Sequence, residues 1–468
     1  MKPLKLRLPH TLILIYIMVV LTVVATWVIP GGEYERAQKG SQTVPVAGSY
    51  HRVESRPQGL DGLFVSPAKG FVAAAMIIFI VFVCGGTFNV IQKTGAITAV
   101  IHNLSLKFGE SKALRTLFIP VTMILFSLGG AIWGMCEETM PFILIFVPLA
   151  LSLGYDTIVG VALPFLGAAS GFAGAFFNPF TVGIAQGIAG LPLYSGLGYR
   201  LIVWAGGTAI AIAVVMRYAA RVRRDPKTSP TYEDDLAKRA KYDVDKPVIE
   251  KIPVSGAHKR VLFVFAAGFA VMIFGILKYA WGIGPIAGVF LAIGIFSGIL
   301  GRLSGDEIGK AFVEGAKDMV NAALIIGTAR AILIVAQDGK ILDTILAGMA
   351  GSISSFHPLI SAQIMFVSQC VINFFVHSGT AQAALTIPIM APLGDLVGIT
   401  RQTAVFAFQL AEYINPVLPT SGVTMGVLGL AGLRWDKWAR WLVPLLVLWV
   451  LFAALALIPP VLMKWGPA

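Results

Sequence analysis

Two long apolar segments of this chain are each interrupted by the same helix-breaking sequence. One begins at Asn178 and reads NPFTVG, and the other begins at Asn415 and reads NPVLPTSG. Proline has no backbone N–H to donate, so it interrupts a helix. Inside a membrane each backbone group freed in this way needs a partner, so interrupted helices occur only around a cavity or a buried site. The two matching breaks predict one site built from both halves of the chain.

Composition places these segments in a lipid bilayer. Of the 468 residues, 57% are hydrophobic and 13% are charged, whereas soluble domains average about 25% charged residues. The apolar runs reach the roughly 20 residues that one membrane crossing requires. We attribute the net charge of +12 to cytoplasmic loops, and we expect no nucleic-acid partner. Cys84, Cys136 and Cys370 lie in apolar surroundings and are expected to be packing residues.

The distribution of basic residues predicts the orientation. Lys2, Lys5 and Arg7 precede an apolar run at 11–30, which we expect to be the first membrane helix with its N-terminus in the cytoplasm. The strongest basic cluster lies at 221–258, which we expect to be a cytoplasmic, solvated linker without a partner. The segment 31–68 would then be an extracytoplasmic loop. The expected location is the cytoplasmic (inner) membrane of a bacterial-type cell.

The two halves share more than the breaks. Pro148 and Pro392 are separated by the same offset as Gly154 and Gly398. Self-similarity at a half-chain period indicates two copies of one structural unit. We therefore predict an all-α polytopic membrane protein with a first transmembrane repeat at 1–220 and a second at 259–468. Each repeat would contain a re-entrant hairpin, at about 121–153 and 360–397, and a broken helix, at about 158–190 and 403–432.

Each expected hairpin has a tip rich in small and polar residues, at 129–139 and at 373–382. The N–H groups at helix ends favour anions, whereas freed carbonyls and Asn or Thr oxygens suit Na⁺. Two tips and two breaks would bring four polar elements together near the membrane midplane. Their candidate substrate-binding residues are Thr139, Asn178, Thr181, Ser378, Gly379, Thr380, Gln382, Asn415, Thr420 and Ser421. A Na⁺ site is expected near Asn178, Thr181, Asn415 and Thr420.

Acidic residues within the apolar segments are candidates for function, because a charge at the bilayer centre costs about 3 kcal/mol. Glu138, at the first tip, is expected to bind a cationic substrate group or to carry a proton, and its structural alternative is capping of the next helix. Its neighbour Glu137 would face elsewhere. Glu412, just before the second break, is the acidic candidate of the second half, with a structural hydrogen-bonding role as the alternative.

Two basic residues complete the candidate set. Arg330 is the lone cation of its apolar run and could clamp a substrate carboxylate, pair permanently with an acid such as Glu138, or reach an interface. His377, at the second tip, is a candidate proton-coupling group or a structural histidine. Farther along, Trp435, Trp438 and Trp441 are interspersed with basic residues, a pattern that is typical of an anchor at the membrane interface.

Several phrases resemble one transporter family. They are EETMPF at 137–142, GYDTIVGV at 154–161, NPFTVGIAQ at 178–186, DGKILDTIL at 338–346 and QAALTIPIMAP at 382–392. They resemble the C4-dicarboxylate anaerobic carrier family of the ion transporter superfamily, in its YfcC-like branch, whose members are often labelled basic amino acid antiporters. The resemblance covers essentially the whole chain. It implies inverted repeats, a scaffold with a mobile transport domain, elevator-type movement and a homodimer.

The leading hypothesis is a secondary active transporter of a small organic ion, driven by Na⁺, H⁺ or exchange. No Walker A sequence occurs, so ATP is not the direct energy source in this chain. The acidic candidates and Arg330 suit an amino acid, including a basic one, whereas the polar turns suit a C4-dicarboxylate or another small carboxylate. An intramembrane enzyme is a remote alternative, since the six histidines are scattered and no His-Glu-x-x-His occurs. A passive channel is another. We predict no catalytic residue and no cofactor other than a coupling ion.

Overall fold

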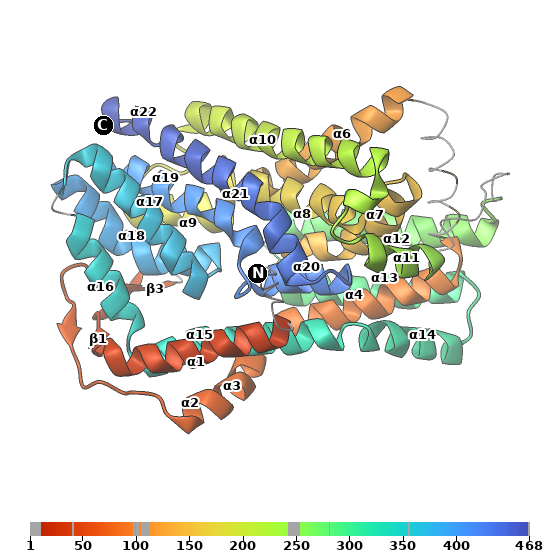
Figure 1. Ribbon diagram of the computed structural model, residues 1–468, viewed down its shortest axis with the longest axis horizontal. Coiled ribbons are helices and arrows are strands. Elements are labelled where there is room, and N and C mark those ends of the chain that lie inside the picture. The colour runs from red at the N-terminus through yellow and green to blue at the C-terminus, as the bar shows by residue number, and fades with distance from the viewer. Residues whose placement is uncertain are drawn as a thin grey trace, which may run out of the picture.

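The computed structural model describes residues 11–466 apart from 40–41, 97–98, 100–102, 104–111, 242–252, 280 and 354–355 (Figure 1). The basic N-terminal residues that predict the orientation lie outside the described residues. Six helical stretches of the described chain are long and apolar enough to cross a membrane. They are α4 (Ala75–Lys93), α10 (Leu197–Arg224), α13 (Ile283–Leu300), α15 (Val320–Asp338), α17 (Pro358–Phe375) and the stretch Trp435–Leu462. The chain is therefore a helical, multi-pass membrane protein.

The first half contains a helical hairpin followed by an interrupted helix. Helix α6 (Lys112–Trp133) and helix α7 (Met140–Ser152) flank the first tip, which contains a 3₁₀ turn, η1 (Glu137–Thr139). Helix α8 (Thr157–Ala173) then runs to the first break, where a π-helical turn, η2 (Pro179–Gly183), leads into α9 (Ile184–Ala189). Both α6 and α7 pack against α8.

The second half has the same order of elements. Helix α17 and helix α18 (Gly379–Leu396) flank the second tip, and α19 (Arg401–Leu410) runs to the second break. That break is a 3₁₀ segment, η4 (Ala411–Val417), which precedes α20 (Gly422–Leu430), α21 (Trp435–Ala456) and α22 (Ile458–Leu462). The division into inverted repeats and the domain boundaries stay predictions.

Matching local signals begin both interrupted helices. Gly154 (φ +81°) and Gly398 (φ +76°) take the left-handed conformation that glycine adopts without strain. Two residues later, Asp156 accepts a hydrogen bond from the N–H of Val159, and Thr400 accepts one from the N–H of Thr403. The shared offset seen in the sequence thus corresponds to the same turn and cap in both halves.

A layer of long helices lies on one side of the hairpins and breaks, and α10 and α21 lie on the other (Figure 1). In that layer α3 (Ser66–Ala73) packs against α15, and α4 packs against α14 (Gly305–Lys317). Glycines allow both contacts: a Cβ at Gly70 would lie 2.3 Å from the carbonyl oxygen of Gly327, and one at Gly85 would lie 2.5 Å from that of Gly315. Close backbone approach at small residues is how membrane helices pack tightly. Helices α1 (Thr11–Val28), α12 (Gly256–Tyr279) and α13 complete this layer, with α1 packed on α15 and α12 on α13.

The segment after α1 contains short strands, which the all-α prediction did not include. Strand β1 (Gly32–Glu33) pairs antiparallel with β4 (His51–Arg52), and β2 (Arg36–Lys39) pairs antiparallel with β3 (Gln42–Pro45), before the short helix α2 (Leu60–Phe64). Ion pairs fix this segment beside α16 (Leu342–Ile353): Arg36 pairs with Asp343 at 2.7 Å and Lys340 pairs with Glu33 at 2.7 Å. The hydrogen bond from Lys340 lowers the pKa of Glu33.

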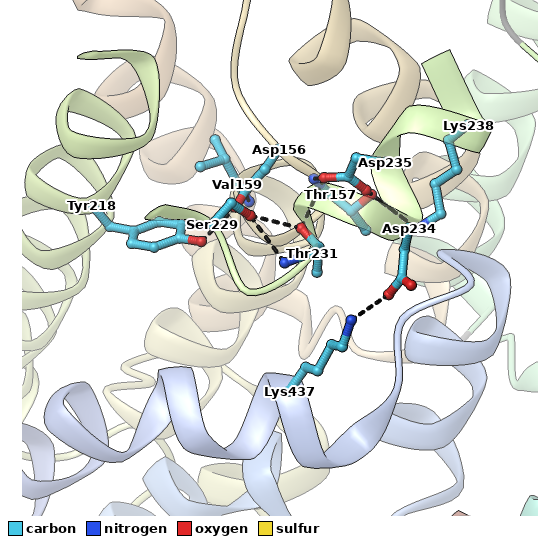
Figure 2. Close-up of polar contacts among 10 residues, drawn as sticks. All are labelled: Asp156, Thr157, Val159, Tyr218, Ser229, Thr231, Asp234, Asp235, Lys238 and Lys437. Carbon is cyan, nitrogen blue, oxygen red and sulfur yellow. Dashed lines mark hydrogen bonds and ion pairs between the residues drawn. The ribbon is translucent and has the colours of Figure 1, made fainter. Parts of the chain in front are cut away.

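The described part of the 221–258 linker is not a free, solvated segment. It forms a 3₁₀ turn, η3 (Pro226–Thr228), and helix α11 (Tyr232–Lys241), and α11 packs against α7. Polar side chains of this segment are buried against α8 and α10 (Figure 2). The expectation of a solvated segment is therefore wrong for Ser229, Thr231 and Asp235, which are buried, with Asp235 capping α8. The linker boundaries and the absence of a partner molecule stay predictions.

Candidate substrate-binding site

The first hairpin tip lies directly against the first break. Gly134 has a φ of +74°, and a Cβ there would lie 2.7 Å from the Oδ1 of Asn178. The N–H of Phe177 donates to the carbonyl oxygen of Ala131, at the end of α6, over 3.0 Å. Glycine is therefore required at this point of the tip, where the hairpin reaches the break without a side chain between them.

Asn178 holds the first break together. Its buried Oδ1 accepts hydrogen bonds from the N–H groups of Phe180 (2.9 Å) and Thr181 (3.3 Å), as the first residue of a helix often does. Its Nδ2 and the hydroxyl of Thr181 are buried without a hydrogen-bond partner among the described residues. Buried polar atoms are nearly always paired in proteins, so these two atoms point to a binding role.

The second break is tied to the second tip in a corresponding way. The Nδ2 of Asn415 donates to the carbonyl oxygen of His377 (3.1 Å) and to the Oε2 of Glu412 (3.2 Å). The hydroxyl of Thr424, on α20, donates to the carbonyl oxygen of Asn415 over 3.0 Å. Each half therefore joins its own tip to its own break.

The second tip also contacts the first break, so the two halves meet. The hydroxyl of Thr380 donates to the carbonyl oxygen of Phe180 over 2.8 Å. A Cβ at Gly379 would lie 2.6 Å from the Cγ2 of Thr181 and 3.1 Å from the Oε1 of Glu412. The helix that follows each break also packs on the hairpin of the other half: α9, after the first break, packs on α18, and α20, after the second break, packs on α7. Four elements thus converge on one region.

A small cavity lies between the first tip and the second break. Its volume is about 20 Å³, which is room for one water molecule and far less than the several hundred Å³ of a typical ligand pocket. The convergent elements are therefore closed upon one another in this conformation. The lining residues come from both halves: Met135, Cys136, Thr139, Phe165, Ala168, Ala169, Phe172, Glu412, Asn415, Pro416 and Val423.

Two buried carboxylates lie at or beside this cavity: Glu412 lines it, and Glu138 lies in the first tip between the lining residues Cys136 and Thr139. Glu138 is 8% exposed, and its Oε2 accepts a hydrogen bond from the N–H of Cys136 over 2.9 Å. Glu412 is 1% exposed, and its Oε1 has no hydrogen-bond partner in the described part of the chain. Neither carboxylate forms an ion pair with a described residue. Because a buried charge without a partner is costly, these groups suit a cation or a proton.

The basic candidates lie near the second tip. Arg330 forms no ion pair within the described ranges, so the predicted permanent pair with Glu138 does not occur there. Its Nε is buried and unpartnered, and its charge lies within electrostatic range of His377. The Nδ1 of His377 is likewise buried and lacks a partner among the residues described.

Several other candidates have identifiable structural contacts. Ser378 and Ser421 accept hydrogen bonds from the N–H groups of Ala381 and Thr424 and so cap α18 and α20. The Nε2 of Gln382 donates to the carbonyl oxygen (2.9 Å) and Oε1 (2.8 Å) of Gln369, which joins the two helices of the second hairpin.

Two threonines differ in what their hydroxyls contact. The hydroxyl of Thr139 donates to the carbonyl oxygen of Cys136 within the first tip. The hydroxyl of Thr420 is buried without a partner in the described structure. The free oxygens of Thr181, Thr420 and Glu412 are of the type that binds alkali cations. No group of three or more His, Cys, Asp or Glu side chains that could hold a metal ion occurs in the described ranges.

Sequence reasoning missed residues that support the breaks. The indole N–H of Trp435 donates to the carbonyl oxygen of Val417 (2.9 Å), and that of Trp438 donates to the carbonyl oxygen of Pro416 (2.8 Å). Trp438 is fully buried, so its prediction as an interfacial anchor is wrong: it satisfies a backbone group that the break frees. The i, i+3 spacing of these two tryptophans, which places both indoles on one face of α21, was the sequence signal that could have indicated this role.

Two buried amides were also not singled out. The Nε2 of Gln409, on α19, donates to the carbonyl oxygen of Phe172 near the end of α8, which links the two interrupted helices. Both polar atoms of Asn373, at the end of α17, are buried without a hydrogen bond of normal geometry to a described residue, and the side chain lies beside the carboxylate of Glu412. Gln409 lies inside a predicted apolar helix, where a lone amide carries no position-specific signal. Asn373 is the first residue of the predicted second tip and was not among the candidate site residues.

Comparisons with known proteins identify the family. The family model of the C4-dicarboxylate anaerobic carriers (DcuC) matches residues 8–462 of this chain. This chain belongs to the DcuC family. Among similar sequences, a protein of Escherichia coli (strain K12) named "Putative basic amino acid antiporter YfcC" is 38% identical over 461 residues, 90% of each chain. An uncharacterised protein of Haemophilus influenzae (strain ATCC 51907 / DSM 11121 / KW20 / Rd) is 31% identical over 466 residues, again 90% of each chain.

These matches place the chain in the YfcC-like branch of the DcuC family and assign it to membrane transporters rather than enzymes. Among solved structures, the YdaH transporter of Alcanivorax borkumensis aligns with 98% of this chain and 100% of its own, with a TM-score of 0.43 and 16% identity. MtrF of Neisseria gonorrhoeae aligns with 99% of this chain and 98% of its own, with a TM-score of 0.41 and 18% identity.

Proposed function

We propose that this DcuC-family member is a secondary active transporter of a small organic ion, specifically an amino acid of the basic type. The observation that carries this proposal is the pair of buried carboxylates, Glu412 at the closed cavity and Glu138 in the adjoining first tip, with no described cation paired to either. The ammonium or guanidinium group of the cargo would pair with them, since a charge-assisted hydrogen bond offsets much of the cost of burial. The name of the Escherichia coli relative supports the same class of cargo.

Transport would be driven by an ion gradient or by exchange. Glu138 and His377 are the proposed proton carriers, because each is titratable and lies at a hairpin tip. Na⁺ is the alternative coupling ion. Its proposed site lies near Asn178, Thr181, Asn415 and Thr420, where the hydroxyls of Thr181 and Thr420 are free.

The proposed mechanism is an elevator movement of two inverted repeats. One interlocked unit contains the two tips, the two breaks and the helices α9 and α20, which each pack on the other half. This unit would move against the layer that contains α3, α4, α14 and α15. We also propose a homodimer in the cytoplasmic (inner) membrane of a bacterial-type cell, with the N-terminus in the cytoplasm.

A C4-dicarboxylate or another small carboxylate is the second candidate cargo. One specific observation favours it: Arg330 lies near the second tip with an unpartnered Nε, where its guanidinium could bind a carboxylate. The same contact would bind the α-carboxylate of an amino acid, so Arg330 alone does not distinguish the two cargoes. The two acidic residues favour the amino acid.

Counterflow into proteoliposomes tests these proposals. Vesicles containing the purified protein are loaded with one unlabelled compound from a panel of basic and neutral amino acids and C4-dicarboxylates, and uptake of the labelled compound is followed with and without H⁺ and Na⁺ gradients. We expect exchange or gradient-driven uptake of basic amino acids. Uptake of dicarboxylates alone would support the second cargo, and no flux of any compound would contradict the transporter proposal itself.

A further inference from the structure

The first turn of α8 is capped by carboxylates from two distant parts of the chain (Figure 2). The N–H of Val159 donates to Asp156, three residues earlier, over 2.9 Å. The N–H of Thr157 donates to Asp235 of α11, 78 residues later, over 3.0 Å, and the hydroxyl of Thr157 donates to the same carboxylate. Because helix N-termini have unpaired N–H groups that carboxylates satisfy, α11 completes the beginning of α8.

Both carboxylates are buried and fully partnered, unlike Glu412. Asp156 is 2% exposed, and its Oδ2 accepts hydrogen bonds from the hydroxyls of Ser229 (2.6 Å) and Tyr218. Asp235 is 4% exposed and also accepts a hydrogen bond from the hydroxyl of Thr231 over 2.8 Å. Burial raises the pKa of Asp156, and the three donors around it favour its charged form. A network with every member paired holds one arrangement more firmly than isolated contacts do.

The same helix is attached to the second half of the molecule. Asp234, next to Asp235 in sequence, pairs with Lys437 of α21 at 2.7 Å (Figure 2). Lys437 lies between Trp435 and Trp438, whose indoles hold the last carbonyls of the second break. Helix α11 therefore contacts the beginning of one interrupted helix through Asp235 and the support of the other break through Asp234.

These contacts form a continuous physical connection between the two half-sites. From Thr157, α8 extends 17 residues toward Asn178, a length of about 25 Å. From Lys437, one turn of α21 reaches the carbonyl oxygens of Pro416 and Val417. A shift of α11 would therefore displace the beginning of α8 and the support of the second break together.

We propose that α11 is a clamp that holds the two half-sites in register, with Asp234 and Asp235 as positioning residues that do not touch the cargo. This inference rests on the proposed transport function, because its consequence is cargo affinity. Loosening the clamp would misalign Asn178 and Asn415 and weaken binding, while the residues that contact the cargo stay unchanged. The predicted signature is a raised KM with little change in maximal rate.

The test compares three charge-neutralising variants of α11 in proteoliposomes. D235N removes the charge that caps α8 and pairs with Lys238, and it replaces one of the two oxygens that accept from Thr157 with an amide nitrogen. D234N removes the pair with Lys437, and E233Q is the control, because Glu233 is exposed on the same helix. We expect E233Q to match the wild-type protein. D234N should raise KM about two- to fivefold, the range for a partly exposed ion pair, and D235N should raise it further. The charge-exchanged double variant D234K/K437D should restore most of the affinity lost in D234N.

A second measurement is independent of transport. Spin labels on Glu233→Cys and Arg440→Cys, in a protein lacking the three native cysteines, report the distance between α11 and α21. We expect one narrow distance distribution, which broadens when D235N is added and does not broaden when D225N, a change within the linker turn, is added. An unchanged distribution in D235N, or equal KM values in D235N and E233Q, would overturn the clamp. If no variant transports any cargo but the distribution broadens as expected, the transport proposal fails and the clamp stands.

Discussion

At the scale of single residues, the candidate site is defined by polar atoms that are buried and unpaired. The Nδ2 of Asn178, the hydroxyl of Thr181 and the Oε1 of Glu412 all lack a partner among the described residues. By contrast, the buried carboxylates of Asp156 and Asp235 are each paired with several donors. Leaving a buried polar atom unpaired costs about 1–3 kcal/mol, so these atoms are expected to bind cargo or ions.

Glu412→Gln tests whether transport needs the negative charge of Glu412 or only the volume of its side chain. Gln keeps the volume of the side chain but cannot pair with a cationic cargo, so we expect transport of basic amino acids to fall at least about tenfold in kcat/KM, the result of losing 1.4 kcal/mol or more. Thermal stability should stay equal or rise, because removing an unpaired buried charge relieves its desolvation cost. Proteoliposome uptake and thermal unfolding in detergent measure both effects. Normal uptake in E412Q would remove Glu412 from the site.

Asn178→Ala and Asn415→Ala test the two breaks. Asn178→Ala removes the acceptor that caps the first break, at a cost of about 1–2 kcal/mol. Asn415→Ala removes the donor that joins the second break to His377 and Glu412. We expect each variant to insert into the membrane and to transport more slowly than wild type. Membrane fractionation and uptake kinetics, including their cation dependence, are the measurements. Unchanged kinetics and cation dependence in both variants would place the site elsewhere.

At the scale of elements, each interrupted helix depends on partners that are distant in the chain. The first break depends on Gly134 of the first tip and on Thr380 of the second. The second break depends on the indoles of Trp435 and Trp438. Helices α4 and α14 depend instead on backbone contact at Gly85 and Gly315.

Trp438→Phe tests the support of the second break. Phe preserves most of the ring but leaves the buried carbonyl oxygen of Pro416 unpaired, which should cost about 1–3 kcal/mol. Trp441→Phe is the matched control, since Trp441 packs against Tyr218 and Trp438, whereas the indoles that donate to the break are those of Trp435 and Trp438. Thermal unfolding in detergent should fall for W438F and change little for W441F. Equal effects would indicate that only ring packing matters.

Gly85→Ala tests the contact between α4 and α14. The added Cβ would lie 2.5 Å from the carbonyl oxygen of Gly315, so the helices must separate, with an expected loss of about 1–3 kcal/mol. Gly309→Ala on α14 is the control, because nothing lies within 4 Å of a Cβ there. We expect a lower unfolding temperature for G85A only. A stable G85A would show that this helix pair is not tightly packed.

At the scale of the whole molecule, the features fixed by local sequence could be predicted, whereas contacts between segments that are distant in the chain could not. The proline, glycine and asparagine patterns at 129–139, 178–183, 373–382 and 415–422 correspond to tips and breaks because each acts on its own backbone. The burial of Trp438 and the docking of Asp235 on Thr157 were not predictable, since both depend on segments that packing alone brings together. The short strands after α1 were missed because two-residue pairings carry little pattern.

The central claim, that cargo binds between the first tip and the second break, can be tested with a native residue. Cys136 lines the cavity there, and Cys84→Ala with Cys370→Ala leaves it as the single thiol. The rate of maleimide labelling of Cys136 is measured with increasing concentrations of a transported amino acid. We predict that the cargo slows labelling, with half-protection near its transport KM, and that a compound that is not transported has no effect. A cargo that is transported but leaves the labelling rate unchanged would contradict the claim.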